Sequence, residues 1–474
     1  MKKHLLINSE WISTDSYVTL YSPYTKKVIG EIASADTNDV NKAIEAAANA
    51  RSVMRRMAAH QRAGILENLA SLLQLRREEA ARLIALEAAK PIKTALAEVD
   101  RTIHTYKFAA EEAKRIHGET IPLDAAPGGE NRVAYTIREP IGIIGAITPF
   151  NFPMNLVAHK VGPAIATGNT IVLKPAEQTP LSALFLGELL MEAGLPAGAL
   201  NIVTGKGRVI GDAIVTDPRV SMVTFTGSPE VGISIRSKAG LKRVTLELGS
   251  NAAVIIDDNV DIDPIVERCV TGAFSFQGQV CISLQRIYVV GDKYEEFTAK
   301  FIQASQKLKL GNPLDPETDV SAMITQKDTQ RALDWIQEAK NQGAEVASGG
   351  SVTEDGVLQP TVLLHVSPQS SVSCKEVFAP IVLINKARSV EEAVSFVNDS
   401  NFGLQAGIYT KDIHTAQEAI TQLHVGGVII NDIPTFRVDH MPYGGVKQSG
   451  MGREGIKYAV EEMTEMKLVV FNLN

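Results

Sequence analysis

The chain has 474 residues, more than one hydrophobic core ordinarily supports, so two or three domains are expected. Apolar residues make up 45% and charged residues 21%, an ordinary globular composition that excludes extensive disorder. The formal net charge is −7 and no basic stripe is present, which excludes nucleic acid as an expected partner.

Cysteine usage and hydropathy indicate the compartment. The three cysteines, Cys269, Cys281 and Cys374, are too few for a disulfide framework and are typical of a reducing environment. The opening MKKHLLINSEWIS has only a short apolar run, so it predicts no signal peptide. No stretch approaches the ~20 apolar residues of a membrane helix. We therefore expect a cytoplasmic protein without a membrane partner.

The first part of the chain is rich in helix-forming patterns. Apolar residues recur at helical spacing in three Ala- and Leu-rich runs, at 37–57, 60–89 and about 92–117. Thr37 or Asp39 is the expected N-cap of the first helix. A turn-rich break at 124–132 (DAAPGGENR), flanked by extended segments, predicts an arm rather than a domain.

From residue 141 short buried-strand patterns alternate with helices. The strand patterns are IGIIGAIT, NTIVLKP, GALNIVTG, SMVTFTG and NAAVIIDD. A second series from about residue 253 contains RIYVV, QPTVLLHV, PIVLINKA, AGIYT and GGVIIND. Such alternation predicts two α/β units with parallel sheets and ligands at the carboxyl ends of the strands. MKLVVFNL, near the end, predicts an extended apolar tail.

Several turns after these strands carry groups that could bind a cofactor. The stretch GKGRVIG (205–211) is one residue longer than the GxGxxG fingerprint, and its glycines could admit a pyrophosphate or simply pack a helix. Asn151 in ITPFNFP could satisfy nearby backbone or donate to an oxyanion. Lys174 and Glu177 could be a solvated pair or could grip ribose hydroxyls.

Two further residues suggest covalent chemistry. Cys281 lies in FSFQGQVCISLQR, where a cysteine is either a small packing residue or a nucleophile. Glu247 lies in the apolar run VTLELGSN, where it either faces water or is buried with a raised pKa and acts as a general base. Because an acyl-enzyme thioester needs a base for its hydrolysis, the two residues form a coherent pair if the fold brings them together.

The motifs together resemble the aldehyde dehydrogenase superfamily over essentially the whole chain. Seven of them occur in the family's order: ITPFNFP, NTIVLKPAEQTP, VTFTGSPEVG, LELGSN, FSFQGQVC, KEVFAP and MPYGGVKQSGMGREG. The resemblance implies an α/β fold with a Rossmann-like NAD-binding domain, an α/β catalytic domain and a small β oligomerisation arm. The corresponding ranges are 1–118 with 141–247, then 248–445, and 119–140 with 460–474.

The resemblance also assigns roles to individual residues. It implies Cys281 as the nucleophile, Glu247 as the general base, and Asn151 with the Cys281 N–H as the oxyanion hole. Lys174 and Glu177 would hold the adenosine ribose. The other implied cofactor-binding residues are Thr148, Pro149, Phe150, Gly207, Gly211, Phe225, Gly227, Ser228, Val231, Leu248, Glu376 and Phe378. No metal is implied, and Cys269 and Cys374 fall on no motif, so both are expected to be inert packing residues.

The chain departs from the family pattern at two positions. Gly249-Ser250 stands where the family usually has Gly-Gly, and Phe378-Ala379-Pro380 stands where it usually has Phe-Gly-Pro. Both changes exchange small residues and remove no chemical group, so activity is expected.

The implied reaction is oxidation of an aldehyde to a carboxylate through a cysteine thioester that water hydrolyses. One alternative is the CoA-acylating branch, which typically lacks glutamate at the base position. Another is a non-catalytic structural relative, which usually lacks the nucleophile or the base. Because a carboxylate at Glu177 would repel a 2′-phosphate, we expect NAD rather than NADP. The arm implies a homodimer or homotetramer.

Four residues point to the substrate. Arg101, His159, Arg437 and His440 each have an ordinary structural explanation, but together they could surround an anionic tail. Members that take phosphorylated aldehydes often have an arginine just before the nucleophile, where this chain has Val280. We therefore expect a short polar aldehyde that is lactaldehyde-like or carries one carboxylate (a semialdehyde) or one sulfonate (sulfolactaldehyde-like).

Overall fold

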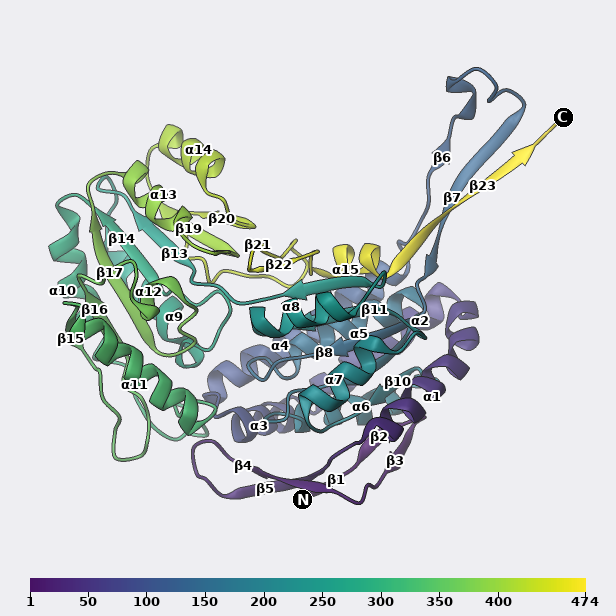
Figure 1. Ribbon diagram of the computed structural model, residues 1–474, viewed down its shortest axis with the longest axis horizontal. Coiled ribbons are helices and arrows are strands. Elements are labelled where there is room, and N and C mark those ends of the chain that lie inside the picture. Colours follow the sequence, from purple (N-terminus) through teal and green to yellow (C-terminus); the bar gives the residue numbers. More distant parts are fainter.

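Two large sheets organise the computed structural model, which describes residues 1–474 (Figure 1). The first sheet has the order β22 (Gly450–Met451), β12 (Arg243–Glu247), β11 (Val220–Thr226), β8 (Ile143–Ile147), β9 (Thr170–Lys174), β10 (Leu200–Ile202), β2 (Leu5–Ile7) and β3 (Glu10–Ile12). Its five strands from β12 to β10 are parallel, as the alternating pattern predicts.

The second sheet lies in the other lobe of Figure 1. Its order is β15 (Glu345–Ser348), β16 (Thr361–Leu364), β17 (Ile381–Ala387), β14 (Arg286–Val290), β13 (Ala253–Ile256), β19 (Gln405–Tyr409) and β20 (Gly427–Ile430). All its neighbours pair in parallel except β15 with β16. The sequence pattern groups NAAVIIDD with the first series, but β13 pairs with β14 and β19 instead. The chain therefore crosses between the lobes just after Glu247.

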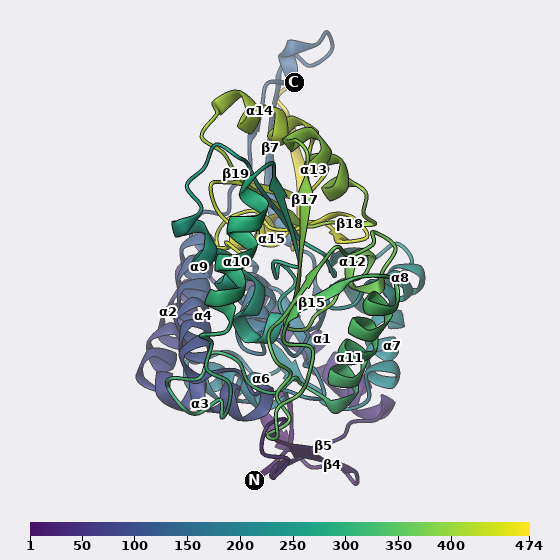
Figure 2. The same cartoon turned by 90° about the vertical axis from the view of Figure 1, so that its left-hand side faces the viewer.

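Helices cover both sheets. With the first sheet lie α1 (Thr37–Arg56), α2 (Ala59–Leu75), α3 (Arg77–Ala88), α4 (Ile92–Ala113), α5 (Asn155–Thr167), α6 (Leu181–Glu192), α7 (Gly207–Thr216), α8 (Pro229–Lys238) and α15 (Ile456–Glu462). With the second lie α9 (Asp263–Phe274), α10 (Lys293–Ser305), α11 (Gln326–Asn341), α12 (Ser371–Cys374), α13 (Val390–Asn398) and α14 (Ile413–Gln422) (Figure 2).

The first helices differ in detail from the sequence prediction. Asp36, not Thr37 or Asp39, is the N-cap of α1: its side chain accepts from the N–H groups of Asn38 and Asp39. The single helix expected over 60–89 is two helices, because the backbone leaves the helical region at Arg76. One non-helical residue barely changes the apolar periodicity, so the pattern does not reveal it. Helix α4 ends at Ala113, four residues before the predicted end at 117.

Three strands form an arm that projects from the body (Figure 1). They are β6 (Thr120–Ile121), β7 (Arg132–Pro140) and β23 (Thr464–Asn472), with β23 antiparallel to β7 along its whole length. Residues 460–463, predicted as part of the arm, instead complete or follow α15. Exposed apolar side chains line β23, among them Leu468 at 55% and Phe471 at 51%. An apolar, exposed ribbon of this kind is typical of a surface that contacts another chain.

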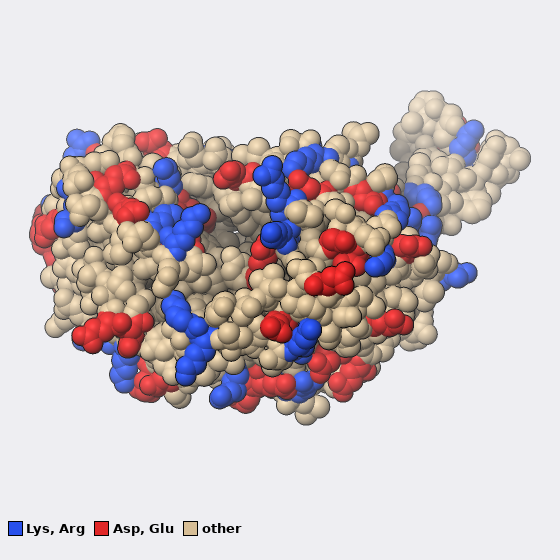
Figure 3. All heavy atoms as spheres, turned by 60° about the horizontal axis from the view of Figure 1, so that its bottom comes forward, with Lys and Arg blue, Asp and Glu red and all other residues tan.

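Smaller elements complete the fold. They are a sheet of β1 (Lys2–Lys3), β5 (Val28–Ala33) and β4 (Tyr17–Tyr21), the pair β18 (Phe402–Gly403) and β21 (Val446–Lys447), and the 3₁₀ turns η1 (Leu123–Ala125) and η2 (Ser275–Gly278). No helix is both long and apolar enough to cross a bilayer. Figure 3 shows acidic and basic side chains interspersed over one face, with the surface hollowed between the two lobes.

Candidate active site

A cavity of about 200 Å³ lies where segments of both lobes meet. Among its lining residues are Glu98, Arg101, Phe152, Asn155, Thr226, Glu247, Leu248, Val280, Cys281, Arg437, Tyr443 and Glu454. These residues come from α4, the start of α5, the ends of β11 and β12, the loop after η2 and the segment after β20. The fold therefore brings Cys281 and Glu247, 34 positions apart, to one cavity.

A strained turn presents Cys281. Phe276 and Gln277 have left-handed φ values of 48° and 55°, and Gly278 follows at 67°. A Cβ at Gly278 would lie 2.2 Å from the carbonyl oxygen of Ala379, so only glycine fits there. Burial, and next the negative charge of Glu376, raise the pKa of the Cys281 thiol to about 12. The resting thiol is therefore protonated at neutral pH.

Glu247 ends β12 and is 3% exposed, so the predicted buried carboxylate is confirmed. Neither of its side-chain oxygens has a hydrogen-bond partner. Burial, and next the negative charge of Glu454, raise the pKa of Glu247 well above its ordinary value. Gly444 leaves space for this carboxylate, because a Cβ there would lie 2.9 Å from Oε1.

Asn151 is 1% exposed in the loop between β8 and α5. Its Nδ2 donates to the carbonyl of Gln279 at 3.0 Å, and its Oδ1 has no partner. The Asn151 side chain lowers the pKa of the Cys281 thiol and so partly offsets the effect of burial. The amide therefore lies beside the sulfur and the loop that carries it.

Lys174 and Glu177 meet the N-terminus of α7. Lys174 ends β9, and burial lowers the pKa of its ammonium. Glu177 is exposed, and its Oε1 accepts the Gly207 N–H at 2.7 Å. A Cβ at Gly207 would lie 3.5 Å from that oxygen and 3.8 Å from Lys174 Nζ. A donor and an acceptor this close suit the two hydroxyls of a ribose.

The residues at the ends of β11 and β12 and in the loops that follow them are closely packed. A Cβ at Gly227 would lie 2.5 Å from the Phe225 ring, so the ring covers that glycine. Ser228 caps α8 by accepting the Val231 N–H at 3.4 Å, and Val231 is 47% exposed. Leu248 is buried and lines the cavity. Gly211 lies within α7, where an added Cβ would meet only Ile147, at 3.7 Å.

The segment containing Glu376 and Phe378 faces these loops from the other lobe. Glu376 accepts the Ser250 N–H at 3.0 Å, and burial raises its pKa to about 7. A Cβ at Gly249 would lie 2.5 Å from the Glu376 carboxylate, so this position requires glycine. The departure from the family's Gly-Gly pair falls on the next residue, Ser250, and leaves Gly249 in place. The Phe378 ring meets the Phe150 ring edge to face at 5.8 Å.

Thr148 and Pro149 lie on the same loop as Phe150. The buried hydroxyl of Thr148 has no partner, while its N–H donates to the carbonyl of Lys174. An unsatisfied buried hydroxyl next to the β8 and β9 ends fits a loop that receives a polar ligand.

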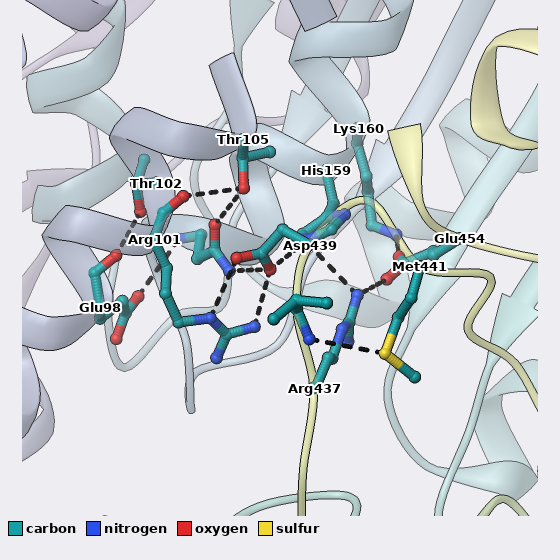
Figure 4. Close-up of polar contacts among 12 residues, drawn as sticks. Glu98, Arg101, Thr102, Thr105, His159, Lys160, Arg437, Asp439, Met441 and Glu454 are labelled. Carbon is teal, nitrogen blue, oxygen red and sulfur yellow. Dashed lines mark hydrogen bonds and ion pairs between the residues drawn. The ribbon is translucent and has the colours of Figure 1, made fainter. Parts of the chain in front are cut away.

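Two arginines line the cavity. Arg101 binds Asp439 with both Nη2 (2.7 Å) and Nε (3.1 Å), and its side chain is 31% exposed (Figure 4). Arg437 donates from Nη2 to Glu454 at 3.0 Å and lies 3.6 Å from the centre of the Tyr443 ring. Its Nε is buried and has no partner. Arg437 therefore lines the cavity as a cation whose Nη2 is already bound to Glu454.

The structure does not place the two histidines in the cavity lining. His159 is buried, with Nε2 2.8 Å from Asp439 Oδ1 and 3.3 Å from Arg437 Nη2 (Figure 4). His440 is exposed, and its ring lies 4.8 Å from that of Phe108. The expectation that all four residues surround one ligand is therefore wrong for the histidines. The sequence does not reveal this, because packing of distant segments sets the partners of His159 on α5 and turns the loop residue His440 outward.

The remaining cysteines differ from each other. Cys269 is fully buried, as predicted. Cys374 is exposed at the end of α12, so the prediction that it is a packing residue is wrong. No cluster of three or more His, Cys, Asp or Glu side chains is arranged to hold a metal ion.

Several buried charges of the site are missing from the sequence prediction. Asp439 accepts from Arg101, His159 and Asn155, the last at 3.0 Å. Glu454 binds Lys160 Nζ at 3.1 Å in addition to Arg437. The sequence indicates this network only through two acidic residues. Asp439 lies two positions after Arg437, and Glu454 lies within the motif MPYGGVKQSGMGREG.

The comparisons with known proteins identify the family of the chain. The model of the aldehyde dehydrogenase family matches residues 11–469. The chain belongs to the aldehyde dehydrogenase family. It is therefore an oxidoreductase that oxidises an aldehyde with NAD(P).

Individual relatives cover nearly the whole chain. It is 47% identical to the 3-sulfolactaldehyde dehydrogenase of Priestia megaterium over 99% of this chain and 98% of the relative. It is 41% identical to the lactaldehyde dehydrogenase of Methanococcus aeolicus over 99% of this chain and 100% of the relative.

Solved structures of other proteins also match this chain over its whole length. Aldehyde dehydrogenase 21 from Physcomitrella patens, in complex with the reaction product succinate, superposes with a TM-score of 0.97 at 41% identity, over 100% of this chain and 98% of that one. An NADP-dependent glyceraldehyde-3-phosphate dehydrogenase from Bacillus halodurans, complexed with NADP, has a TM-score of 0.97 at 37% identity over 100% of both chains.

Proposed function

We propose that aldehyde oxidation here proceeds through Cys281 and ends in hydrolysis. The Cys281 thiol loses its proton to solvent as its sulfur adds to the aldehyde carbon, and Asn151 Nδ2 with the Cys281 N–H stabilises the oxygen that becomes negative. Bound NAD(P) supplies the acceptor for the hydride that leaves this carbon. Glu247 then takes a proton from water, whose oxygen attacks the thioester carbon, and the thiolate departs to leave a carboxylic acid.

The observation that carries this proposal is the state of Glu247. Its two oxygens have no partner, and it lines the same cavity as Cys281. A buried carboxylate without internal hydrogen bonds is free to bind water and, with its raised pKa, to act as a base. The presence of this glutamate favours hydrolysis over transfer of the acyl group to CoA. Retention of both nucleophile and base also argues against a non-catalytic relative.

The proposed substrate is a short polar or anionic aldehyde, such as lactaldehyde, sulfolactaldehyde or a semialdehyde. The guanidinium of Arg437 and the partly exposed guanidinium of Arg101 place positive charge in the lining of the cavity. Val280, next to the nucleophile, adds no cation, which favours one negative charge over a phosphate dianion. Two similar proteins are named 3-sulfolactaldehyde dehydrogenase and lactaldehyde dehydrogenase, and these names support a short polar or anionic aldehyde as the substrate.

A panel of aldehydes assayed by NADH formation tests this proposal. Arg101→Ala is expected to raise KM for the anionic aldehyde about tenfold or more, and much less for propionaldehyde, because one charge-assisted contact is lost. Arg77→Ala is a matched control: Arg77 binds Asp100 in the same forked way, at 2.6 and 2.8 Å, and does not line the cavity. Equal effects of Arg101→Ala on both aldehydes would show that Arg101 does not contact the anionic tail, and the assignment of an anionic substrate would be withdrawn.

We further propose NAD as the preferred cofactor, a cytoplasmic location and an oligomer built through the arm. The carboxylate of Glu177 at the α7 N-terminus supports NAD, because a 2′-phosphate there would meet a negative charge. Three unpaired cysteines support a reducing compartment. The apolar side chains exposed on β23 support association, as a homodimer or homotetramer.

A further inference from the structure

A fully buried lysine holds the backbone of the loop that contains Asn151. Lys90 lies in the linker between α3 and α4, and its side chain has no exposure. Its Nζ donates to the carbonyl oxygen of Asn151 at 2.6 Å. The same ammonium lies 3.8 Å from the centre of the Phe152 ring and 4.3 Å from that of Phe276. One cation therefore contacts the Asn151 loop and the turn that precedes Cys281.

The partner of this lysine fixes the start of α5. Glu98, equally buried, pairs with Lys90 through Oε2. Its Oε1 accepts the N–H of Met154 at 3.0 Å and the N–H of Asn155 at 3.2 Å. Helix α5 has no side-chain cap of its own, so Glu98 serves as its N-terminal acceptor.

The residue before Lys90 holds the nucleophile turn. The Gln277 side chain donates to the carbonyl oxygens of Ala89 at 2.9 Å and Ala322 at 2.8 Å. Gln277 has a left-handed backbone, a conformation that persists only when its surroundings fix it. Ala89 and Lys90 therefore anchor both loops of the active site from one short linker outside either motif.

We propose that Lys90 and Glu98 are positioning residues that set the Asn151 amide against the Cys281 sulfur before substrate binds. The inference rests on the proposed roles of Cys281 and Asn151. A buried ion pair contributes less to the stability of a fold than its charges suggest. Lys90 and Glu98 together make five further contacts to the Asn151 loop and the turn before Cys281, and these contacts fix the positions of the two loops. Such precision matters, because a shift of about 1 Å between reacting groups can cost on the order of a hundredfold in rate.

A double-mutant cycle tests the proposal. The rate compared is kcat/KM for the best aldehyde of the panel, in the wild type, Lys90→Met/Glu98→Gln, Asn151→Ala and the triple variant. The paired substitution is expected to lower kcat/KM roughly 10- to 100-fold with the affinity for NAD unchanged. In the Asn151→Ala background it is expected to cause little further loss, because the side chain that it positions is absent. The same fold loss in both backgrounds would overturn the proposal.

Glu87 provides a matched control for Glu98. It is also fully buried and caps a helix, accepting the N–H of Leu181 at 2.7 Å and of Ser182 at 3.0 Å at the start of α6, and it does not line the cavity. Glu98→Gln is expected to lower kcat/KM, whereas Glu87→Gln is expected to lower only thermal stability. An equal loss of kcat/KM in both variants would show a purely structural role.

The outcomes also separate this inference from the proposed function. If Asn151→Ala keeps full activity, the proposed role of Asn151 fails, and the positioning role fails with it. If Asn151→Ala is impaired but its effect multiplies with that of Glu98→Gln, only the positioning role fails. Glu98→Gln retains Lys90 and an acceptor for both amides, so it completes the cycle even if the Lys90→Met variant does not fold.

Discussion

At the scale of single residues, the site separates two neighbouring carboxyl groups into different charge states. Burial opposes ionisation of Glu454, but Lys160, His159 and Arg437 together hold its pKa down to about 2. Burial and the charge of Glu454 instead raise the pKa of Glu247. Divergent pKa values in one site indicate divergent roles: Glu454 stays anionic and pairs with Lys160 and Arg437, which leaves Glu247 as the group proposed to exchange protons.

Substitution of Glu247 separates the two halves of the proposed reaction. Glu247→Gln is expected to lower steady-state kcat on the order of a hundredfold or more, because thioester hydrolysis loses its base. The first turnover of NADH is expected to persist, since attack by Cys281 precedes hydrolysis. In the wild type kcat is expected to rise with pH as Glu247 loses its proton, and the variant is expected to lack this rise. Stopped-flow and steady-state measurements would show both effects, and loss of the first turnover would contradict them.

The same carboxyl group predicts a pH dependence of stability. Because the folded-state pKa of Glu247 is raised, its protonated form is favoured in the native state; this stabilisation is complete below the unfolded pKa and is lost as pH rises through the folded pKa. Glu247→Gln should therefore raise Tm at about pH 9 relative to the wild type and change it little at about pH 4. A Tm difference that does not vary with pH would show that Glu247 ionises freely in the fold.

At the scale of elements, helix termini determine what each loop can bind. The first N–H of α7 is already occupied by the Glu177 carboxylate, so a negative side chain sits where a phosphate would otherwise be favoured. At the start of α5 the acceptor is instead Glu98, from a different helix. The same rule, that N-terminal N–H groups need acceptors, thus underlies both the proposed cofactor selection at α7 and the proposed alignment of the active site at α5.

Replacement of the acidic group at α7 is expected to change cofactor preference. Glu177→Ser should raise the ratio of kcat/KM for NADP to that for NAD by roughly tenfold or more, because it removes the repulsion and frees the Gly207 N–H. Asp212→Ser is the control: Asp212 lies on the same helix but pairs with Lys238 at 2.8 Å, away from the N-terminus. An unchanged ratio in Glu177→Ser would mean that another group selects the cofactor.

At the scale of the whole molecule, the two sheets and the arm divide the chain. Sheet membership supports the proposed NAD-binding domain, 1–118 with 141–247, and the proposed catalytic domain, 248–445, although β22 returns to the first sheet beyond them. The arm carries its apolar side chains away from both cores, and Figure 1 shows the C-terminus at its tip. An exposed apolar ribbon of this kind is typical of a surface that contacts another chain, which supports the proposed oligomer.

Charges on the arm should therefore disrupt assembly. Leu468→Glu/Val470→Glu places carboxylates at positions that are 55% and 45% exposed in the single chain, so the fold should tolerate them. In an apolar interface they would be buried without partners, and sedimentation should show a smaller species than the wild type. Leu75→Glu, at a site 83% exposed on α2, is the control and should not change the sedimentation coefficient. Identical sedimentation of all three proteins would exclude the arm from the interface.

The sequence by itself determined the family, the alternation of strands and helices, the arm, and the pair Cys281 and Glu247. These features depend on local order, because strand and helix periodicity and short motifs are properties of residues close in the chain. Even so, one strand joined the other sheet and one helix proved to be two, because pairing and single-residue breaks leave the local pattern unchanged.

Only the tertiary structure decided how the charges pair. Arg101 meets Asp439 across 338 positions, and Lys90 meets the Asn151 carbonyl across 61. His159, expected on the cavity wall, lies behind Asp439 instead. A buried charge must find a partner, but which one it finds depends on how distant segments pack, and no local pattern in the chain records that packing.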